Sequence, residues 1–406
     1  MLRPTTNGVL KSYRYHLRLS GNTMNKSRET VLTQRNFNHF AEDPAAAARC
    51  FQLRRSFLRA DSQHAVGQSV CQKYDVAWHT MQSVIDDVNN RTGDSAYAEI
   101  IHGQSDPTAS GRQALGASLE KLAEGIVQTM NARYGSNFVF SGADGLNIPF
   151  QLDEDLNLSY RGIPVDSQIP SVELGTDQQP KAYNEQGAEL DLTVPGVTQD
   201  PEKIYYKLNE TGENGETMIT KAAYDEQKKN VEALEYMAKD EHKFADLGLG
   251  LQEDENGNLI EDSAFDTALQ GINFLGYGVD EDGDPKNMVS LLREMSSILK
   301  NCDADSGEFK PGEREKLDRL AGKFEAVASD MTRQHTELDT RKKFLDSNQA
   351  LLKQNSFTLQ EQFLGMEDAD MAQAISAFVW AKYCYDSSLK VGNSILSQSL
   401  MDYLNT

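Results

Sequence analysis

The feature that most constrains this chain is a pair of long heptad-patterned segments near its two ends. Apolar residues recur from Leu53 to Val88, and again from Leu317 to Leu352, at alternating spacings of four and three residues. This spacing places them on one face of an α-helix and forms a seam that a second helix covers. We therefore expect two long helices that pair, parallel or antiparallel, as a coiled-coil-like rod. The residues expected to pack the rod are Leu53, Phe57, Tyr74, Trp78, Met81 and Ile85 in the first helix and Leu320, Phe324, Met331, Leu338 and Leu345 in the second.

Local signals set the bounds of the expected helices. Asp43 and Pro44 supply an N-cap and a first helical residue, so the first rod helix is expected to begin there. A shorter amphipathic helix is expected over residues 110–133, and the alternation at 137–142 then predicts a strand with a glycine turn. The acidic residues within 367–370 predict the start of a final helix.

Thinner apolar stripes mark the two ends of the chain. One includes Leu10, Tyr13, Leu17 and Met24, and the other includes Ile375, Phe378, Tyr385, Leu389 and Leu396. An isolated helix with so narrow an apolar face is marginal in water. We therefore expect these terminal segments to fold when they meet each other or neighbouring copies of the chain.

The acidic charge of the chain is concentrated in its middle. The formal net charge is -22, and residues 146–290 alone hold 31 acidic against 10 basic side chains. Such a charge disfavours nucleic acid or an anionic membrane as a partner. The sequence has no apolar run long enough to cross a bilayer, and residues 1–20 lack the continuous apolar segment of a cleavable secretory signal. Export, if it occurs, is expected to use another route.

Short alternating runs and turn dipeptides dominate this acidic middle. Together with one expected helix over residues 222–238, they predict a compact α+β insert. Acidic turns that begin at Asp254 and Asp280 offer oxygen ligands to calcium, but the sixth loop position, which calcium loops reserve for glycine, is Leu259 in one and Pro285 in the other. We expect solvated turns, with weak calcium binding as the alternative.

The predicted fold is therefore mainly α, with the two chain ends building the helical framework and an α+β domain inserted between them. The length of 406 residues suits more than one domain. We predict a terminal assembly domain (residues 1–42 with 366–406), a helical rod domain (43–145 with 291–365) and a surface-exposed insert (146–290).

Catalytic and cofactor motifs are missing from the sequence. It contains no H-E-x-x-H, G-x-S-x-G, P-loop or dinucleotide-binding pattern. Glu99 and His102 have the spacing of one half of a carboxylate-bridged metal site, but no second half follows, and a helix end near Gly103 is the simpler interpretation. Four scattered cysteines form no metal-binding spacing. We expect neither an enzyme nor a bound cofactor or metal.

Several motifs resemble those of flagellin-like proteins. They are FAEDPAAAAR at residues 40–49, NARYG leading into FVFSG at 131–142, EDADMA at 367–372 and the ending SLMDYL at 399–404. The first is similar to an acidic-Pro-Ala motif of the family, and the second to the junction where its variable domain is inserted. The ending is similar to that of the hook-associated members rather than the flagellins.

This resemblance implies a structural component of the bacterial flagellum, exported through the flagellar type III apparatus and assembled as a ring between hook and filament. It also implies partners: an adjacent hook-associated protein, flagellin, further copies of the chain, and an export chaperone bound to the C-terminal helix. The implied subunit contacts are Leu10, Tyr13, Leu17, Met24, Ile375, Phe378, Tyr385, Leu389 and Leu396. The alternative for each of these residues is a core contact within one chain.

Two other functions stay open from the sequence. The chain could be a flagellin that forms the filament itself. It could also carry an enzymatic domain in the acidic insert, although the missing zinc-protease motif disfavours the usual form of that idea.

Overall fold

The computed structural model describes most of the chain and divides it into two compact units. The described residues are 6–90, 95–153, 156–175, 179–190, 200–209, 217–257, 259–260, 263–303 and 308–404, with the backbone alone for 6–7 and 395–404. One unit comprises residues 1–65 with 349–406, and the other comprises residues 66–348. Helices make up 62% of the structure, which confirms the prediction of a mainly α fold with an α+β region. None of the described helices is long and apolar enough to cross a membrane.

The two long helices of the rod are α2 (Pro44–Asn89) and α8 (Glu313–Glu367). Helix α2 begins where Asp43 caps it, because the Ala46 N–H donates to Asp43 Oδ1 at 2.9 Å. The helices are antiparallel: Asp75 on α2 is paired with Lys342 on α8 at 2.6 Å, and Trp78, one turn further along α2, contacts the earlier α8 residue His335, with ring centroids 5.0 Å apart.

The predicted seam residues are all buried or half-buried in the chain. Seven are buried: Tyr74, Met81, Leu320, Phe324, Met331, Leu338 and Leu345. Four are half-buried: Leu53, Phe57, Trp78 and Ile85. Within the first unit, Phe57 meets Phe363 with ring centroids 5.4 Å apart, so the helices also pair there.

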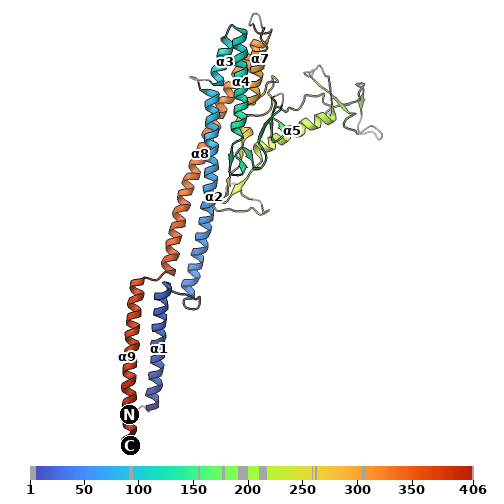
Figure 1. Ribbon diagram of the computed structural model, residues 1–406. Helices are drawn as coiled ribbons and strands as arrows, with labels where there is room; N and C mark the ends of the chain where they lie inside the picture. The colour runs from blue at the N-terminus through green and yellow to red at the C-terminus, as the bar shows by residue number, and fades with distance from the viewer. Residues whose placement is uncertain are drawn as a thin grey trace. The chain divides into compact units, whose positions relative to one another are not determined.

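Three further helices pack side by side in the second unit: α3 (Ala96–Ser105), α4 (Ala109–Met130) and α7 (Met288–Lys300), as Figure 1 shows. Glycines allow their close approach. A Cβ atom on Gly116 of α4 would lie 2.9 Å from the Ser296 carbonyl oxygen of α7, and the Ser296 hydroxyl donates to the Gly116 carbonyl oxygen at 2.6 Å. Gly103 likewise packs against Leu299 from within α3, and the helix end expected near Gly103 follows at Ser105.

The region between these helices holds short antiparallel strands and two more helices. The strands pair in the orders β1-β2, β13-β3, β4-β5-β6, β10-β9-β7-β8 and β11-β12. Their bounds are β1 Arg133–Tyr134, β2 Asn137–Phe138, β3 Ser141–Gly142, β4 Phe150–Leu152, β5 Leu158–Tyr160, β6 Ile163–Pro164, β7 Ala182–Tyr183, β8 Glu189–Leu190, β9 Tyr205–Lys207, β10 Met218–Thr220, β11 Phe244–Ala245, β12 Phe265–Asp266 and β13 Leu269–Gln270; the helices are α5 Lys221–Lys239 and α6 Gly271–Leu275.

Much of this inserted region shares one hydrophobic core with the helices of the second unit. Phe150, Tyr160 and Leu247 are almost fully buried in the same cluster as Met81 and Phe324. A smaller, separate cluster of Val172, Ala182, Ile204 and Tyr206 holds the sheet β10-β9-β7-β8 together. The insert is therefore anchored in the rod over part of its length. The division into three domains stays a prediction.

The first unit contains the two terminal helices, α1 (Thr6–Thr33) and α9 (Met371–Leu404), which lie side by side (Figure 1). The expected start of the last helix at residue 367 differs from the structure, because Glu367 is the final residue of α8. Helix α9 begins after Asp370, whose Oδ1 accepts from the N–H groups of Ala372 and Gln373 at 2.9 and 3.3 Å. The capping carboxylate thus stands at the end of the acidic run.

Candidate assembly interface

Helices α1 and α9 approach each other through two reciprocal tyrosine–glycine contacts. Tyr385 of α9 lies over Gly21 of α1, where a Cβ atom would come within 3.3 Å of the tyrosine Cε2. Tyr13 of α1 lies over Gly392 of α9, where a Cβ atom would overlap the phenol ring. Each aromatic ring therefore occupies space that any residue larger than glycine would fill. This arrangement fixes the register of the two helices.

Small and half-buried residues complete the contact between α1 and α9. Ala374 and Ala381 are buried on α9. The predicted contact residues Leu10, Tyr13, Leu17, Met24, Phe378 and Tyr385 are half-buried along the same faces. These six side chains keep part of their apolar surface in solvent. The pair of helices α1 and α9 alone therefore does not fully bury the apolar faces that meet between them.

The outer side of α9 is also apolar. Ile375 and Leu389, which the resemblance implies as contacts between subunits, are 48% and 43% exposed within one chain, and their role in such contacts stays a prediction. Four residues that the stripe did not include are more exposed still: Val379, Trp380, Tyr383 and Val391. The side chain of Leu396 lies outside the described residues. All four are apolar residues of the sequence that lie off the heptad stripe. A prediction based on one seam does not include them.

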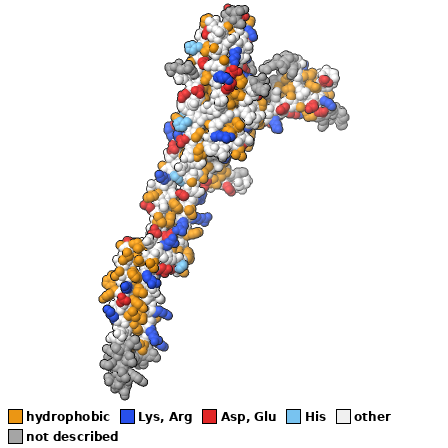
Figure 2. Space-filling view, in the orientation of Figure 1, with side chains coloured by type: hydrophobic (Ala, Val, Ile, Leu, Met, Phe, Trp, Pro, Cys, Tyr) orange, Lys and Arg blue, Asp and Glu red, His pale blue; other side chains and the backbone are white. Residues whose placement is uncertain are grey.

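Exposed apolar side chains continue on the other elements of the first unit. Figure 2 shows hydrophobic side chains gathered over the pair of helices α1 and α9. Of the large apolar side chains that the structure describes as exposed, more than half belong to this unit, although it is the smaller one: Val9, Tyr15, Leu19, Leu32, Phe40, Phe51, Leu58, Leu351, Phe357, Leu364, Ile375, Val379, Trp380, Tyr383, Leu389 and Val391. A hollow of about 630 Å³ also opens beside Tyr13, Leu17 and Val391. Clusters of this kind mark surfaces that bind other proteins.

Within the first unit, a buried carboxylate lies where the terminal helices α1 and α9 meet the rod helices α2 and α8. Glu367 is 7% exposed and forms ion pairs with Arg54 and, at 3.3 Å, with Arg35. The Asn36 side chain donates to the carbonyl oxygens of Met366 and Asp368 at 3.0 and 2.9 Å. The α1–α2 connection is therefore bound to the α8–α9 turn. Burial, reinforced by Glu367, raises the pKa of the nearby Cys50 thiol, which favours its protonated form.

The acidic turn at Asp280 does bring three carboxylates together, but protein cations already neutralise them. Asp280, Asp282 and Asp284 have oxygen atoms within 4.8 Å of one another, and the Lys323 ammonium contacts all three. Arg319 Nε donates to Asp284 at 2.6 Å, and these hydrogen bonds lower the pKa of the buried Asp284 to about 2. The Lys323 ammonium thus occupies the position between the three carboxylates that a metal cation would take. The Asp254 turn is exposed, with the Gly257 N–H donating to the Asp254 carbonyl oxygen at 3.1 Å.

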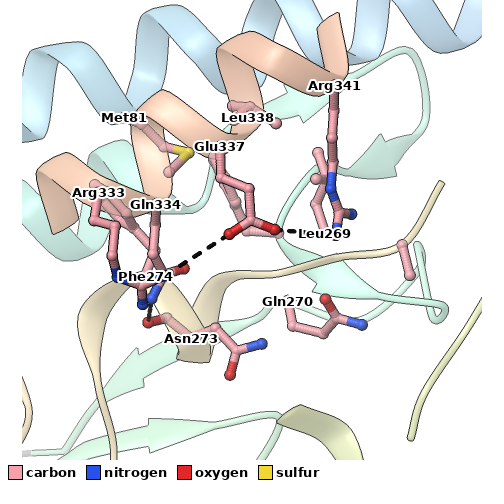
Figure 3. Close-up of a pocket in the computed structure, with 12 residues that line it drawn as sticks. Met81, Leu269, Gln270, Asn273, Phe274, Arg333, Gln334, Glu337, Leu338 and Arg341 are labelled. Atoms are coloured by element: carbon pink, nitrogen blue, oxygen red, sulfur yellow. Dashed lines mark hydrogen bonds and ion pairs between the residues drawn. The ribbon is translucent and has the colours of Figure 1, made fainter. Parts of the chain in front are cut away.

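A second cavity, of about 320 Å³, lies between α8 and the segment formed by β13 and α6 (Figure 3). Glu337 on α8 pairs with Arg333 at 3.9 Å and with Arg341 at 3.3 Å. Gln334 donates to the Asn273 carbonyl oxygen across the cavity. The charged groups at its mouth therefore compensate one another, which is the arrangement of a structural contact between rod and insert.

Comparison with known proteins gives structural neighbours but no family model. No protein-family model matches the sequence, and no curated protein matches it. The structure is similar to a flagellar hook-associated protein of Vibrio parahaemolyticus, with a TM-score of 0.47 and 11% identity over 80% of this chain and 99% of that one. It is also similar to the flagellar junction protein FlgL of Legionella pneumophila (TM-score 0.39, 11% identity, 74% and 99% covered) and to FlgL of Bacillus cereus (TM-score 0.37, 12% identity, 77% and 99% covered).

Proposed function

We propose that this chain is a non-enzymatic structural subunit of the bacterial flagellum that forms the junction ring between hook and filament. The motifs at residues 40–49, 131–142 and 367–372, which resemble those of flagellin-like proteins, support this assignment. The ending at 399–404, similar to that of hook-associated members, favours the junction over the filament.

One structural observation carries the proposal: α9 has apolar residues on several sides, including large exposed ones on the side away from α1. Ala374, Ala381 and Gly392 face α1, whereas Trp380 and Tyr383 on its outer side are 68% and 65% exposed. A helix with apolar residues on every side is stable when it is buried on every side. Helix α1 covers one face, so the remaining face requires neighbouring subunits. An assembly built by the paired chain ends supplies them.

The test of the junction role is deletion of the gene in its native host. Electron microscopy of the cells and an assay of the medium for flagellin are expected to show bare hooks with flagellin shed into the medium. Complementation with the intact gene is expected to restore attached filaments. Normal filaments on the deleted cells would refute the proposal.

The filament-subunit alternative makes a different prediction about location. A junction subunit is expected as a single site of label at the base of each filament when an epitope is placed in the exposed Asp254 turn. A flagellin would instead be labelled along the whole filament. Immunogold microscopy of the same strain distinguishes the two.

Export is proposed to precede assembly, with a chaperone bound to the C-terminal helix. The exposed apolar side chains Ile375, Val379 and Trp380 suit a groove that receives an amphipathic helix. The same face would then pass from chaperone to neighbouring subunit. Deletion of residues 365–406 is expected to abolish recovery of the chaperone in a pull-down from the host, and unchanged recovery would exclude this part of the proposal.

A further inference from the structure

The strongest unassigned feature is a cavity of about 280 Å³ within the second unit, where α2 meets the β1–β2 hairpin and the β11–β12 region. Its lining includes Lys73, Gly135, Ser136, Asn137, Lys243 and Thr267. Two lysines and several hydroxyl and amide groups therefore share a small space. None of these lining residues carries a carboxylate, although the whole chain holds 62 acidic side chains.

Main-chain carbonyl groups hold the two lysines in place. Lys73 Nζ donates to the Thr267 carbonyl oxygen at 2.8 Å, and Lys243 Nζ donates to the Ala143 carbonyl oxygen at 3.3 Å. The Thr267 hydroxyl and N–H both donate to the Lys243 carbonyl oxygen at 2.8 Å, which ties the segments that carry the two anchors. An ammonium group has three N–H donors, so each lysine retains donors for a ligand.

The charges of this pair are not neutralised by an ion pair among the described residues. Burial of Lys73, together with the positive charge of Lys243, lowers the pKa of Lys73 to about 8. The Asp266 carboxylate acts in the opposite direction and raises the pKa of Lys73. That carboxylate already accepts hydrogen bonds from His242 at 2.8 Å and from the N–H groups of Lys243 and Ala268 at 3.0 and 2.9 Å. Two like charges that repel each other in one cavity are stabilised by an anion placed between them.

We propose that this cavity is a binding site for a small oxyanion, a phosphate or carboxylate group held by Lys73 and Lys243. Ser136 and Asn137 supply further hydrogen-bonding groups, and the backbone at Gly135, where a Cβ atom would meet nothing within 4 Å, lets the ligand approach the main chain. The Glu241 carboxylate lies against Gly142 and is paired with Arg161 at 2.8 Å. The oxyanion is either free in solution or the side-chain carboxylate of a second copy of this acidic chain. The site lies within one unit of one chain, so it does not depend on the role in the flagellum.

The test is titration of the full-length protein with inorganic phosphate at pH 7, against chloride at equal ionic strength. Calorimetry is expected to show binding to the wild type, with the dissociation constant raised at least tenfold in Lys73→Met and in Lys243→Met. Lys229→Met, on the exposed face of α5, is the matched control and is expected to bind as the wild type does. Lys243 is exposed, so its variant keeps the test valid if Lys73→Met fails to fold.

Sedimentation velocity separates the two sources of the oxyanion. If a second copy supplies the carboxylate, the wild type self-associates, phosphate dissociates it, and neither lysine variant self-associates. If the ligand is free, phosphate binds without a change in association state. Equal phosphate affinity in the wild type and both variants would overturn the proposal. So would a wild type that neither binds phosphate nor differs from the variants in self-association.

Discussion

Two tyrosine–glycine pairs determine how closely the terminal helices approach. Gly392→Ala is expected to push Tyr13 out of its position, at a cost of about 1–3 kcal/mol typical of overpacking, which exceeds the gain in helix propensity of up to about 1 kcal/mol. Hydrogen–deuterium exchange is expected to accelerate for the amides of α1 and α9. Gly322→Ala is the control, because nothing lies within 4 Å of the position its Cβ would take. The amides of α1 and α9 in Gly322→Ala should exchange at the wild-type rate. If those of Gly392→Ala also exchange at the wild-type rate, the contact between Tyr13 and Gly392 does not stabilise the helix pair.

The carboxylate of Asp284 holds the acidic turn against α8. Asp284→Asn removes the charged acceptor of Arg319 and Lys323 and is expected to lower the free energy of unfolding by about 2 kcal/mol at pH 6. Because the folded-state pKa is lowered to about 2, this contribution is fully present above the unfolded pKa, near 4, and is lost as the pH falls toward 2.

Urea unfolding at several pH values measures this difference. The stability gap between the wild type and Asp284→Asn is expected to be largest above pH 5 and to narrow between pH 4 and pH 2. Glu325→Gln, at an exposed position of α8, serves as the control and should show no such gap. A gap that is independent of pH would contradict the assigned ion pairs.

At the scale of the elements, we expect the antiparallel pair α2–α8 to depend on buried seam residues rather than on ion pairs such as Asp75–Lys342. Phe324 is 1% exposed in the core shared by helices and insert, so Phe324→Ala is expected to cost about 3–5 kcal/mol. Leu351→Ala, at a position of the same helix that is 70% exposed, should change the free energy of unfolding by less than about 0.5 kcal/mol. If Phe324→Ala and Leu351→Ala lower the urea midpoint of unfolding equally, the buried seam residues do not stabilise the pair more than exposed ones do.

For the whole molecule, the exposed side of α9 is the surface on which the proposed assembly depends. Trp380→Glu is expected to leave the isolated chain folded, because Trp380 is 68% exposed, and to weaken subunit association by about 2 kcal/mol or more, about thirtyfold. The measurement is the fraction of cells with attached filaments after complementation of the deletion strain.

Ser347→Glu provides the control for this surface. Ser347 is exposed on α8, outside α1 and α9, and the variant adds the same charge without removing an apolar side chain. Cells that carry it are expected to keep most of their filaments. If both variants restore filaments equally well, the outer side of α9 does not take part in assembly.

Local sequence signals were sufficient to predict the longest helices and the buried faces of α2 and α8. A heptad period is a local property of one helix, so the inward residues of α2 and α8, such as Tyr74 and Phe324, could be read from spacing alone. The cap at Asp43 and the helix α5 followed from equally local signals.

The contacts between these elements are visible only in the folded chain. Spacing does not reveal that α2 and α8 are antiparallel, nor that α9 turns Ala374 and Gly392 toward α1 and leaves Ile375 exposed, since several faces of α9 are apolar. It also does not bring Lys73 near Lys243, because 170 residues separate them and the strands between are too short to define a register. Contacts between distant residues depend on packing and shape complementarity, which a local pattern does not encode.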